Sequence, residues 1–164
     1  MARLFVGIWP PADVVSELTA LPRKDRSGVR FVAPENWHVT LRFLGEARPD
    51  EVIDVLDRVT LPAARARLGP SVDIVGDRAL VLPVSGLDGL AAAVAEHTAH
   101  IGAPQRRRFA GHLTIARVKR HVPMPPVLGT FLTTEFEVGE VALVESRLQP
   151  QGARYTTIGI WPTV

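Results

Sequence analysis

The chain has 164 residues, the usual size of one domain or of two small lobes that share a core. It contains no cysteine, which excludes disulfides and thiolate chemistry, and no apolar run approaches the ~20 residues that span a bilayer. We therefore expect a cytoplasmic monomer without a membrane segment. The formal net charge is +2, and Lys24 and Lys119 are the only lysines among 19 basic residues, so an anionic partner is favoured only weakly.

Strands and helices alternate along most of the chain. Alternating or continuous apolar residues predict the strands, apolar residues at helical spacing predict the helices, and proline or glycine marks most of the ends. Strands are predicted over residues 3–9, 31–32, 38–45, 71–75, 79–84, 112–118, 136–146 and 154–161. Helices are predicted over residues 14–21, 49–59 and 87–101.

One four-residue pattern occurs twice. Residues 38–41 read His-Val-Thr-Leu, and residues 112–115 read His-Leu-Thr-Ile. Strict alternation is typical of a half-buried strand, in which neighbouring side chains point to opposite faces. Each strand therefore presents one imidazole and one hydroxyl on the same face.

The surrounding elements are duplicated as well. The order strand, helix, loop and His-x-Thr strand occurs over about residues 4–45 and again over about 79–118. Duplicated halves often pack about a pseudo-two-fold axis, which would bring the two histidine strands to the middle. We therefore expect residues 1–164 to form a single α+β domain of two pseudo-symmetric lobes, with antiparallel sheets, outer helices and a central cleft.

Two imidazoles and two hydroxyls in one cleft suit the hydrolysis of a strained cyclic phosphodiester. One imidazole can take a proton from water while the other protonates the leaving oxygen. Thr40 and Thr114 can donate hydrogen bonds to the charge that develops on the phosphate. This chemistry needs neither a metal nor another cofactor, and we expect none.

Several of these residues have more than one possible role. A lone His-x-Thr is usually a structural histidine, but two copies at equivalent places of a duplicated unit favour catalysis. His97, His100 and His121 are a conceivable metal site, although a solvated surface explains them better. Residues 106–108, three consecutive arginines, could hold an RNA backbone or form a solvated loop.

The chain resembles the bacterial RNA 2′,3′-cyclic phosphodiesterases, also named 2′-5′ RNA ligases, of the two-histidine phosphoesterase superfamily. The resemblance rests on residues 34–46 and 109–117, which carry the two motifs. It implies a cleft for the 2′,3′-cyclic phosphate end of RNA, a 2′-phosphate product, His38 as proton donor and His112 as proton acceptor. Gly111 departs from the proline usual in the family, so we expect a looser entry into that strand.

The resemblance also implies substrate-binding roles for Arg117 and Phe43. Strand parity places both on the face opposite the histidines, so a bulge or strand end must redirect Arg117, and Phe43 could be a core residue only. Ligation would be the same reaction run backwards. Two other functions stay open: a cyclic phosphodiesterase for a small nucleotide such as ADP-ribose cyclic phosphate, and a non-catalytic RNA-binding module.

Overall fold

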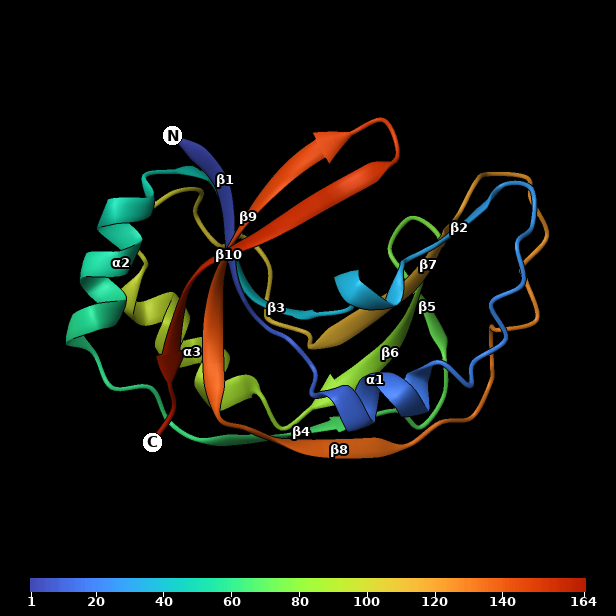
Figure 1. The fold of residues 1–164 in the computed structure, drawn as a ribbon, viewed down its shortest axis with the longest axis horizontal. Coiled ribbons are helices and arrows are strands. Elements are labelled where there is room, and N and C mark those ends of the chain that lie inside the picture. The colour runs from blue at the N-terminus through green and yellow to red at the C-terminus, as the bar shows by residue number, and fades with distance from the viewer.

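Ten strands and three helices build the protein, as a computed structural model of residues 1–164 describes it (Figure 1). In chain order the elements are β1 (Ala2–Ile8), α1 (Ala12–Leu18), β2 (Val29–Phe31), the short 3₁₀ helix η1 (Pro34–Asn36), β3 (Val39–Ala47), α2 (Pro49–Arg58), β4 (Ala64–Leu68), β5 (Asp73–Val75), β6 (Ala79–Ser85), α3 (Asp88–His97), β7 (His112–Val118), β8 (Thr134–Val138), β9 (Glu140–Gln149) and β10 (Gly152–Pro162).

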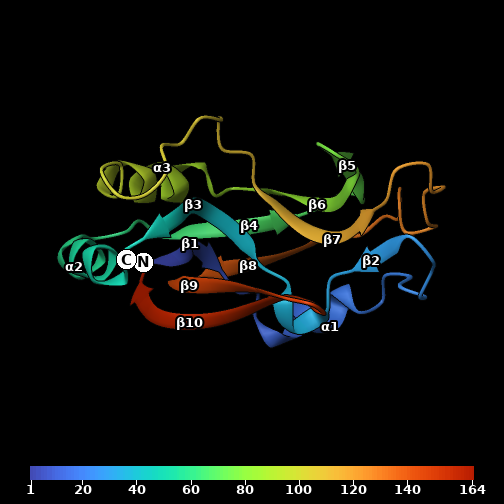
Figure 2. The ribbon, with the colours of Figure 1, turned by 90° about the horizontal axis from the view of Figure 1, so that it is seen from above.

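The strands form one antiparallel path in the order β10-β9-β1-β3-β7-β6-β4-β8, with β2 paired to β7 and β5 to β6. The two strands that carry the repeated motif, β3 and β7, are neighbours at the centre of this path. They pair only at Val39 and Leu113, so the sheet divides there into two halves. Figure 2 shows that the strands curl around the molecule rather than lie in a plane.

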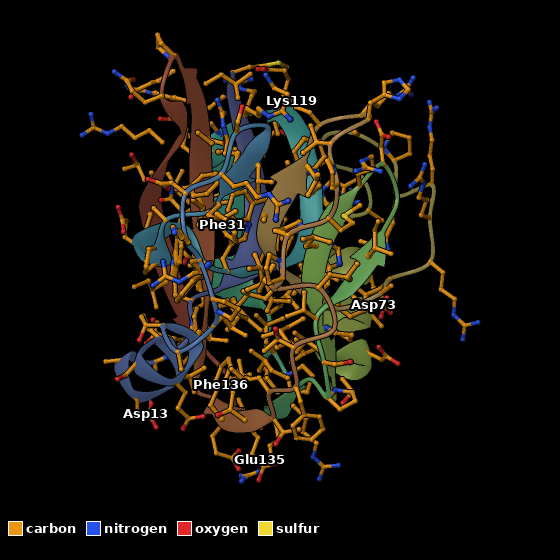
Figure 3. The ribbon with its side chains drawn as sticks, turned by 90° about the vertical axis from the view of Figure 1, so that its right-hand side faces the viewer. Asp13, Phe31, Asp73, Lys119, Glu135 and Phe136 are labelled. Atoms are coloured by element: carbon orange, nitrogen blue, oxygen red, sulfur yellow. The ribbon has the colours of Figure 1, made fainter.

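The helices cover the outside of this sheet. Helices α2 and α3 lie at the same end of the molecule, and α1 lies apart from them (Figures 1 and 2). Helix α1 contacts β8, and Figure 3 shows its Asp13 at the same end as Glu135 and Phe136 of β8. The apolar side chains Val14, Leu56 and Val94, one from each helix, are fully buried in a core cluster that includes strands of both halves.

The predicted α+β class is confirmed, with antiparallel strands and outer helices around a curled sheet. The two predicted sheets are joined into one path by the Val39–Leu113 pair. None of the helices is both long enough and apolar enough to cross a membrane.

The largest differences from the sequence prediction are a strand that was not predicted, a strand that is divided in two and a helix that is shorter. Strand β4 was not predicted, because Arg65 and Arg67 alternate with small alanines and leave no clear apolar pattern. In the structure these arginines form ion pairs with Glu135 and Glu137 of the neighbouring strand β8. The predicted strand 136–146 is two strands that meet at Gly139. Helix α3 ends at 97 rather than 101, and the Thr98 hydroxyl after it donates to the Val94 carbonyl, a local bond that competes with helix continuation.

Candidate active site

The central strands bring the two repeated motifs together. His38 lies immediately before β3, and His112 is the first residue of β7. Because Val39 and Leu113 pair in antiparallel fashion, His38 comes to lie across from Thr114, and Thr40 across from His112. The four polar side chains of the two motifs therefore share one face, related by a local two-fold axis through the Val39–Leu113 pair.

These side chains line one cavity of about 270 Å³, here called the histidine cavity. It is bordered by side chains from β1, β3, β7, β9, β10 and the segment before β3. Its lining residues are Arg3, Phe5, Val32, Asn36, His38, Thr40, Phe43, His112, Thr114, Arg117, Ser146 and Tyr155. All six residues singled out from the sequence are among them. The lining contains two arginines and no carboxylate, so the cavity suits an anion.

Both histidines are held by the same backbone contact. His38 Nδ1 lies 2.7 Å from the carbonyl oxygen of Asn36, and His112 Nδ1 lies 2.8 Å from that of Ala110. A carbonyl oxygen can only accept, so each Nδ1 carries its proton and donates. The Nε2 atoms are left for a ligand: each is a base when its imidazole is neutral and an acid when it is protonated.

The two histidines differ in their surroundings. The His38 ring stacks on Phe5 at a centroid distance of 4.7 Å, and the rings of Tyr155 and Trp9 approach it edge-on at 5.0 Å and 5.6 Å. His112 is exposed. Burial lowers the pKa of His38, the hydrogen bond to Asn36 opposes this shift, and the neighbouring His112 adds to it. His38 is thus held rigidly and, without an anion, is biased toward its neutral form.

A bulge in each strand places the fifth residue after each histidine in the cavity. On β7, Thr114 and Ala116 face consecutive residues of β6, so Ile115 is the extra residue. On β3, Leu41 is likewise extra opposite β1. A bulge reverses the alternation beyond it, so Arg117 and Phe43 turn to the histidine face. Phe43 is 47% exposed and is therefore no core residue.

Several residues that line the cavity were not expected from the sequence. Arg3 and Phe5 share one face of β1, next to the first histidine strand, and the Arg3 guanidinium lies 4.9 Å from the centre of the Phe43 ring, as in a cation–π contact. Tyr155 comes from β10, the far end of the chain, and burial raises the pKa of its hydroxyl, so it stays a donor. Alternation along residues 3–9 was the available signal for Arg3; nothing local indicates Tyr155.

Comparison with known proteins places this site in a family. A family model described as LigT-like phosphoesterase matches residues 8–69, which include the first motif. An RNA 2′,3′-cyclic phosphodiesterase of Aquifex aeolicus is 33% identical over 96% of this chain and 95% of its own length. The chain belongs to the LigT-like phosphoesterase family.

Solved structures support the same assignment over the whole chain. A crystal structure of a phosphoesterase superposes with a TM-score of 0.81 at 25% identity, covering 99% of this chain and 98% of the other. E. coli LigT complexed with 3′-AMP superposes with a TM-score of 0.77 at 27% identity, with the same coverage. The second motif, outside the range of the family model, therefore lies within the common fold.

Gly111, where this family member departs from the usual proline, is tightly held rather than loose. Its carbonyl accepts a hydrogen bond of 2.9 Å from the Val84 backbone. A Cβ at Gly111 would lie 2.4 Å from the Val84 carbonyl oxygen, too close for any side chain without a shift. The structure therefore does not show the looser strand entry that was expected: in this chain β6 approaches Gly111 so closely that a Cβ has no room.

Arg42 anchors β3 behind the cavity. It is 4% exposed, and its guanidinium donates to Thr98 Oγ1 at 2.8 Å and to the carbonyls of Thr98, Ile101 and Ala103 at 3.3, 3.0 and 3.1 Å. The segment that follows α3 is thereby tied to the strand that follows His38.

Other candidates from the sequence lie elsewhere. No group of three or more His, Cys, Asp or Glu side chains is arranged to hold a metal ion, so His97, His100 and His121 form no such cluster. Residues 106–108 line a different hollow together with Arg42 and Glu96, and share no lining residue with the histidine cavity.

Proposed function

We propose that this protein opens the 2′,3′-cyclic phosphate at the end of an RNA and leaves a 2′-phosphomonoester. At the coarser level, it is an enzyme of the RNA 2′,3′-cyclic phosphodiesterase type, because relatives with this name align with the chain over most of their own length. The observation that carries the finer proposal is the presence of two free imidazole Nε2 atoms in one carboxylate-free cavity, with the two threonine hydroxyls of the motifs and two guanidinium groups around them.

In the proposed reaction His112 is the base and His38 the acid. His112 Nε2 takes a proton from the attacking water, the P–O3′ bond breaks, and His38 Nε2–H protonates the departing 3′ oxygen. The bound phosphodiester is an anion, and its charge favours the imidazolium form of His38 against the effect of burial. Each Nδ1–H stays bonded to its carbonyl, so neither ring turns during the reaction.

The remaining polar groups stabilise charge. Thr40 and Thr114 donate to the non-bridging oxygens, on which negative charge grows in the transition state. Arg3 and Arg117 supply positive charge at the same cavity, and Phe43 offers a ring face to a base. Both motifs lie in one chain, so we propose a monomeric catalytic unit. With a 5′-hydroxyl in place of water as the attacking group, the same chemistry would form a P–O5′ bond, break the P–O3′ bond and give 2′-5′ ligation.

These side chains provide the acid, the base and the donors, so we expect hydrolysis to survive exhaustive chelation. Activity with and without a chelator should agree within about twofold, since no metal-bound water is required. Loss of activity that Zn²⁺ or Mg²⁺ restores would contradict this mechanism.

The experiment that tests the proposed function uses an oligonucleotide ending in a 2′,3′-cyclic phosphate. The expected product carries its phosphate on the 2′ oxygen, identified by chromatography against the 2′- and 3′-phosphate standards. A variant with both histidines replaced by alanine, purified in the same way, is the control for contaminating nucleases. A 3′-phosphate product, or a double variant as active as the wild type, would overturn the proposal.

A small nucleotide such as ADP-ribose cyclic phosphate is the competing substrate, and a non-catalytic RNA-binding module the competing class. The first predicts faster hydrolysis of the small molecule than of the oligonucleotide. The second predicts RNA affinity that is unchanged when both histidines are removed. Intact His and Thr in both motifs favour an enzyme, because a binding module needs no acid–base pair.

A further inference from the structure

A second hollow, about 420 Å³ in volume, adjoins the histidine cavity. It is bordered by the paired strands β2 and β7 and by the residues that flank them. Its lining residues are Gly28, Val29, Arg30, Arg117, Val118 and Lys119. We call it the arginine hollow. Arg117 lines both spaces, so ligands in the two spaces would lie on either side of this side chain.

The hollow is built around two like charges that face each other. Arg30 of β2 and Arg117 of β7 are direct cross-strand partners, an arrangement that destabilises a sheet when no counter-charge is present. The ion pairs of the protein involve Arg65, Arg67 and Arg147, but neither of these two residues. No acidic residue lines the hollow, and Lys119 adds a third cation. An anionic ligand would relieve this repulsion.

The arginine hollow lies beside the histidine cavity along the paired strands β2 and β7. Val32, which lines the histidine cavity, donates its backbone N–H to the Ile115 carbonyl at 2.9 Å and so extends the pairing of β2 with β7. Arg30 precedes it by two residues, which places both side chains on the same face about 7 Å apart along the strand. The Arg30 guanidinium also lies beside Gly152, at the start of β10.

The direction of this step is visible in the figures. Strands β2 and β7 run away from β3 toward the right of Figure 1, and Figure 3 looks onto that end, where Phe31 of β2 and Lys119 are labelled. In a terminal nucleotide the cyclic phosphate occupies the 2′ and 3′ oxygens, and the next phosphate is attached to the 5′ oxygen on the other side of the sugar. A second anion site next to the histidine cavity therefore has an obvious occupant.

We propose that Arg30 and Lys119, with Arg117, bind the phosphate on the 5′ oxygen of the nucleotide that carries the cyclic phosphate. In RNA this phosphate is the last internucleotide diester, so the hollow makes the enzyme prefer oligonucleotides to cyclic mononucleotides. The inference rests on the proposed function of the histidine cavity. Guanidinium and ammonium groups suit this role because they donate several hydrogen bonds to phosphate oxygens.

The test compares three adenosine substrates that share the 2′,3′-cyclic phosphate. The first is the mononucleotide with a free 5′-hydroxyl, the second is the same compound with a 5′-phosphate, and the third is a dinucleotide. The variants are Arg30→Ala and Lys119→Ala, and Arg58→Ala is the control, an exposed arginine of α2 at the opposite end of the molecule. Thermal unfolding of each variant checks that the fold is intact.

The wild type should have a kcat/KM at least about tenfold higher for the dinucleotide than for the mononucleotide with a 5′-hydroxyl, as a charge-assisted contact allows. Arg30→Ala should remove most of that advantage and leave the 5′-hydroxyl substrate within about twofold, while Arg58→Ala changes neither. The logarithm of kcat/KM should fall with the logarithm of the salt concentration more steeply for the dinucleotide than for the mononucleotide with a 5′-hydroxyl, by about 0.7 in slope. Arg30→Ala should abolish this difference between the two substrates.

The remaining outcomes are equally informative. An equal gain for the 5′-phosphorylated mononucleotide supports recognition of the phosphate itself, whereas a gain for the dinucleotide alone supports recognition of the diester in RNA. A wild type that hydrolyses all three substrates equally well, or an Arg30→Ala variant that weakens all three alike, would overturn the hollow as a phosphate site. Absence of hydrolysis of every substrate would instead overturn the proposed function.

Discussion

At the scale of single residues, the site depends on which nitrogen of each histidine is free. The carbonyl oxygens of Asn36 and Ala110 accept hydrogen bonds from the Nδ1–H groups of His38 and His112, so both Nε2 atoms are available to a ligand. The two motifs are chemically equivalent, but the residues around them give the two histidines different properties. Three aromatic rings surround His38, while His112 is exposed. The proposed roles of acid and base come from the family resemblance, and the bound anion must offset the effect of burial on His38.

The first prediction concerns the two histidines as a pair. His38→Ala and His112→Ala should each lower kcat by roughly 10²–10⁴, the range for loss of a general acid or base. The double variant should be little worse than either single one, because the two groups act in the same step. Single-turnover rates on a cyclic-phosphate oligonucleotide measure this, and circular dichroism confirms folding. Effects that simply multiply would contradict a concerted pair.

The second prediction follows from the lowered pKa of His38. The proposed donor must be protonated, and its pKa in the free protein is shifted below the usual ~6.5. The protonated fraction, and with it kcat/KM, should therefore fall between pH 7 and 9, approaching tenfold per unit. The alkaline limb of kcat should lie at higher pH, because bound phosphodiester raises the pKa of His38. A kcat/KM that rises from pH 7 to 9 would remove His38 from the donor role.

At the scale of elements, two strand bulges and the close packing of β7 against β6 orient the side chains of the site. Leu41 and Ile115 are the extra residues of two equivalent bulges, each directly after the threonine of its motif. Phe43 and Arg117 thereby reach the histidine face, which a regular strand would deny them. The start of β7 depends equally on Gly111, whose backbone lies against the carbonyl of Val84 on β6.

The third prediction tests this close approach. Gly111→Ala places a Cβ 2.4 Å from the Val84 oxygen. It should cost about 1–3 kcal/mol of unfolding free energy, as other overpacked sites do, and lower kcat by displacing His112. Gly89→Ala in α3 is the matched control, because its Cβ would meet nothing within 4 Å. That change should stabilise the protein by about 0.5–1 kcal/mol.

Urea unfolding and kcat, measured on both glycine variants, decide the matter. Wild-type stability and activity in Gly111→Ala would show that β7 can move away from β6, and the argument for glycine at this position would then be wrong.

At the scale of the whole molecule, the two central strands contribute little to holding the halves of the sheet together. The β3–β7 ladder contributes a single residue pair, Val39 with Leu113. The shared hydrophobic core and Arg42 supply much of the rest, the latter by joining β3 to the segment after α3. Since the proposed site takes one histidine from each half, its geometry depends on this junction.

The fourth prediction concerns that junction. Arg42→Met keeps the apolar stem but leaves the carbonyls of Thr98, Ile101 and Ala103 without this donor. The loss should be about 1–3 kcal/mol of unfolding free energy, the cost of leaving buried acceptors without a hydrogen-bond donor. Arg58→Met, on the exposed end of α2, should change stability by less than ~0.5 kcal/mol. Equal urea midpoints for the two variants would show that Arg42 does not secure the junction.

Much of this protein was determined by its sequence alone. The repeated His-x-Thr pattern, its strands and most helix limits follow from local rules: alternation of side chains along a strand, spacing along a helix, and the breaks that proline imposes. The duplication of residues 4–45 and 79–118 predicted that the two motifs meet. These signals are local or self-similar, so they can be read without knowing which strands are neighbours.

Only the tertiary structure determined which further side chains complete the lining of the site. Parity alone turned Arg117 and Phe43 away from the histidines, because the register of a strand depends on its partner and a bulge cannot be read from one strand. The Tyr155 ring contacts His38, and the Arg3 guanidinium contacts the Phe43 ring, although Tyr155 and Arg3 lie at opposite ends of the chain. Such meetings are set by long-range packing of the sheet, and no local pattern in the sequence encodes them.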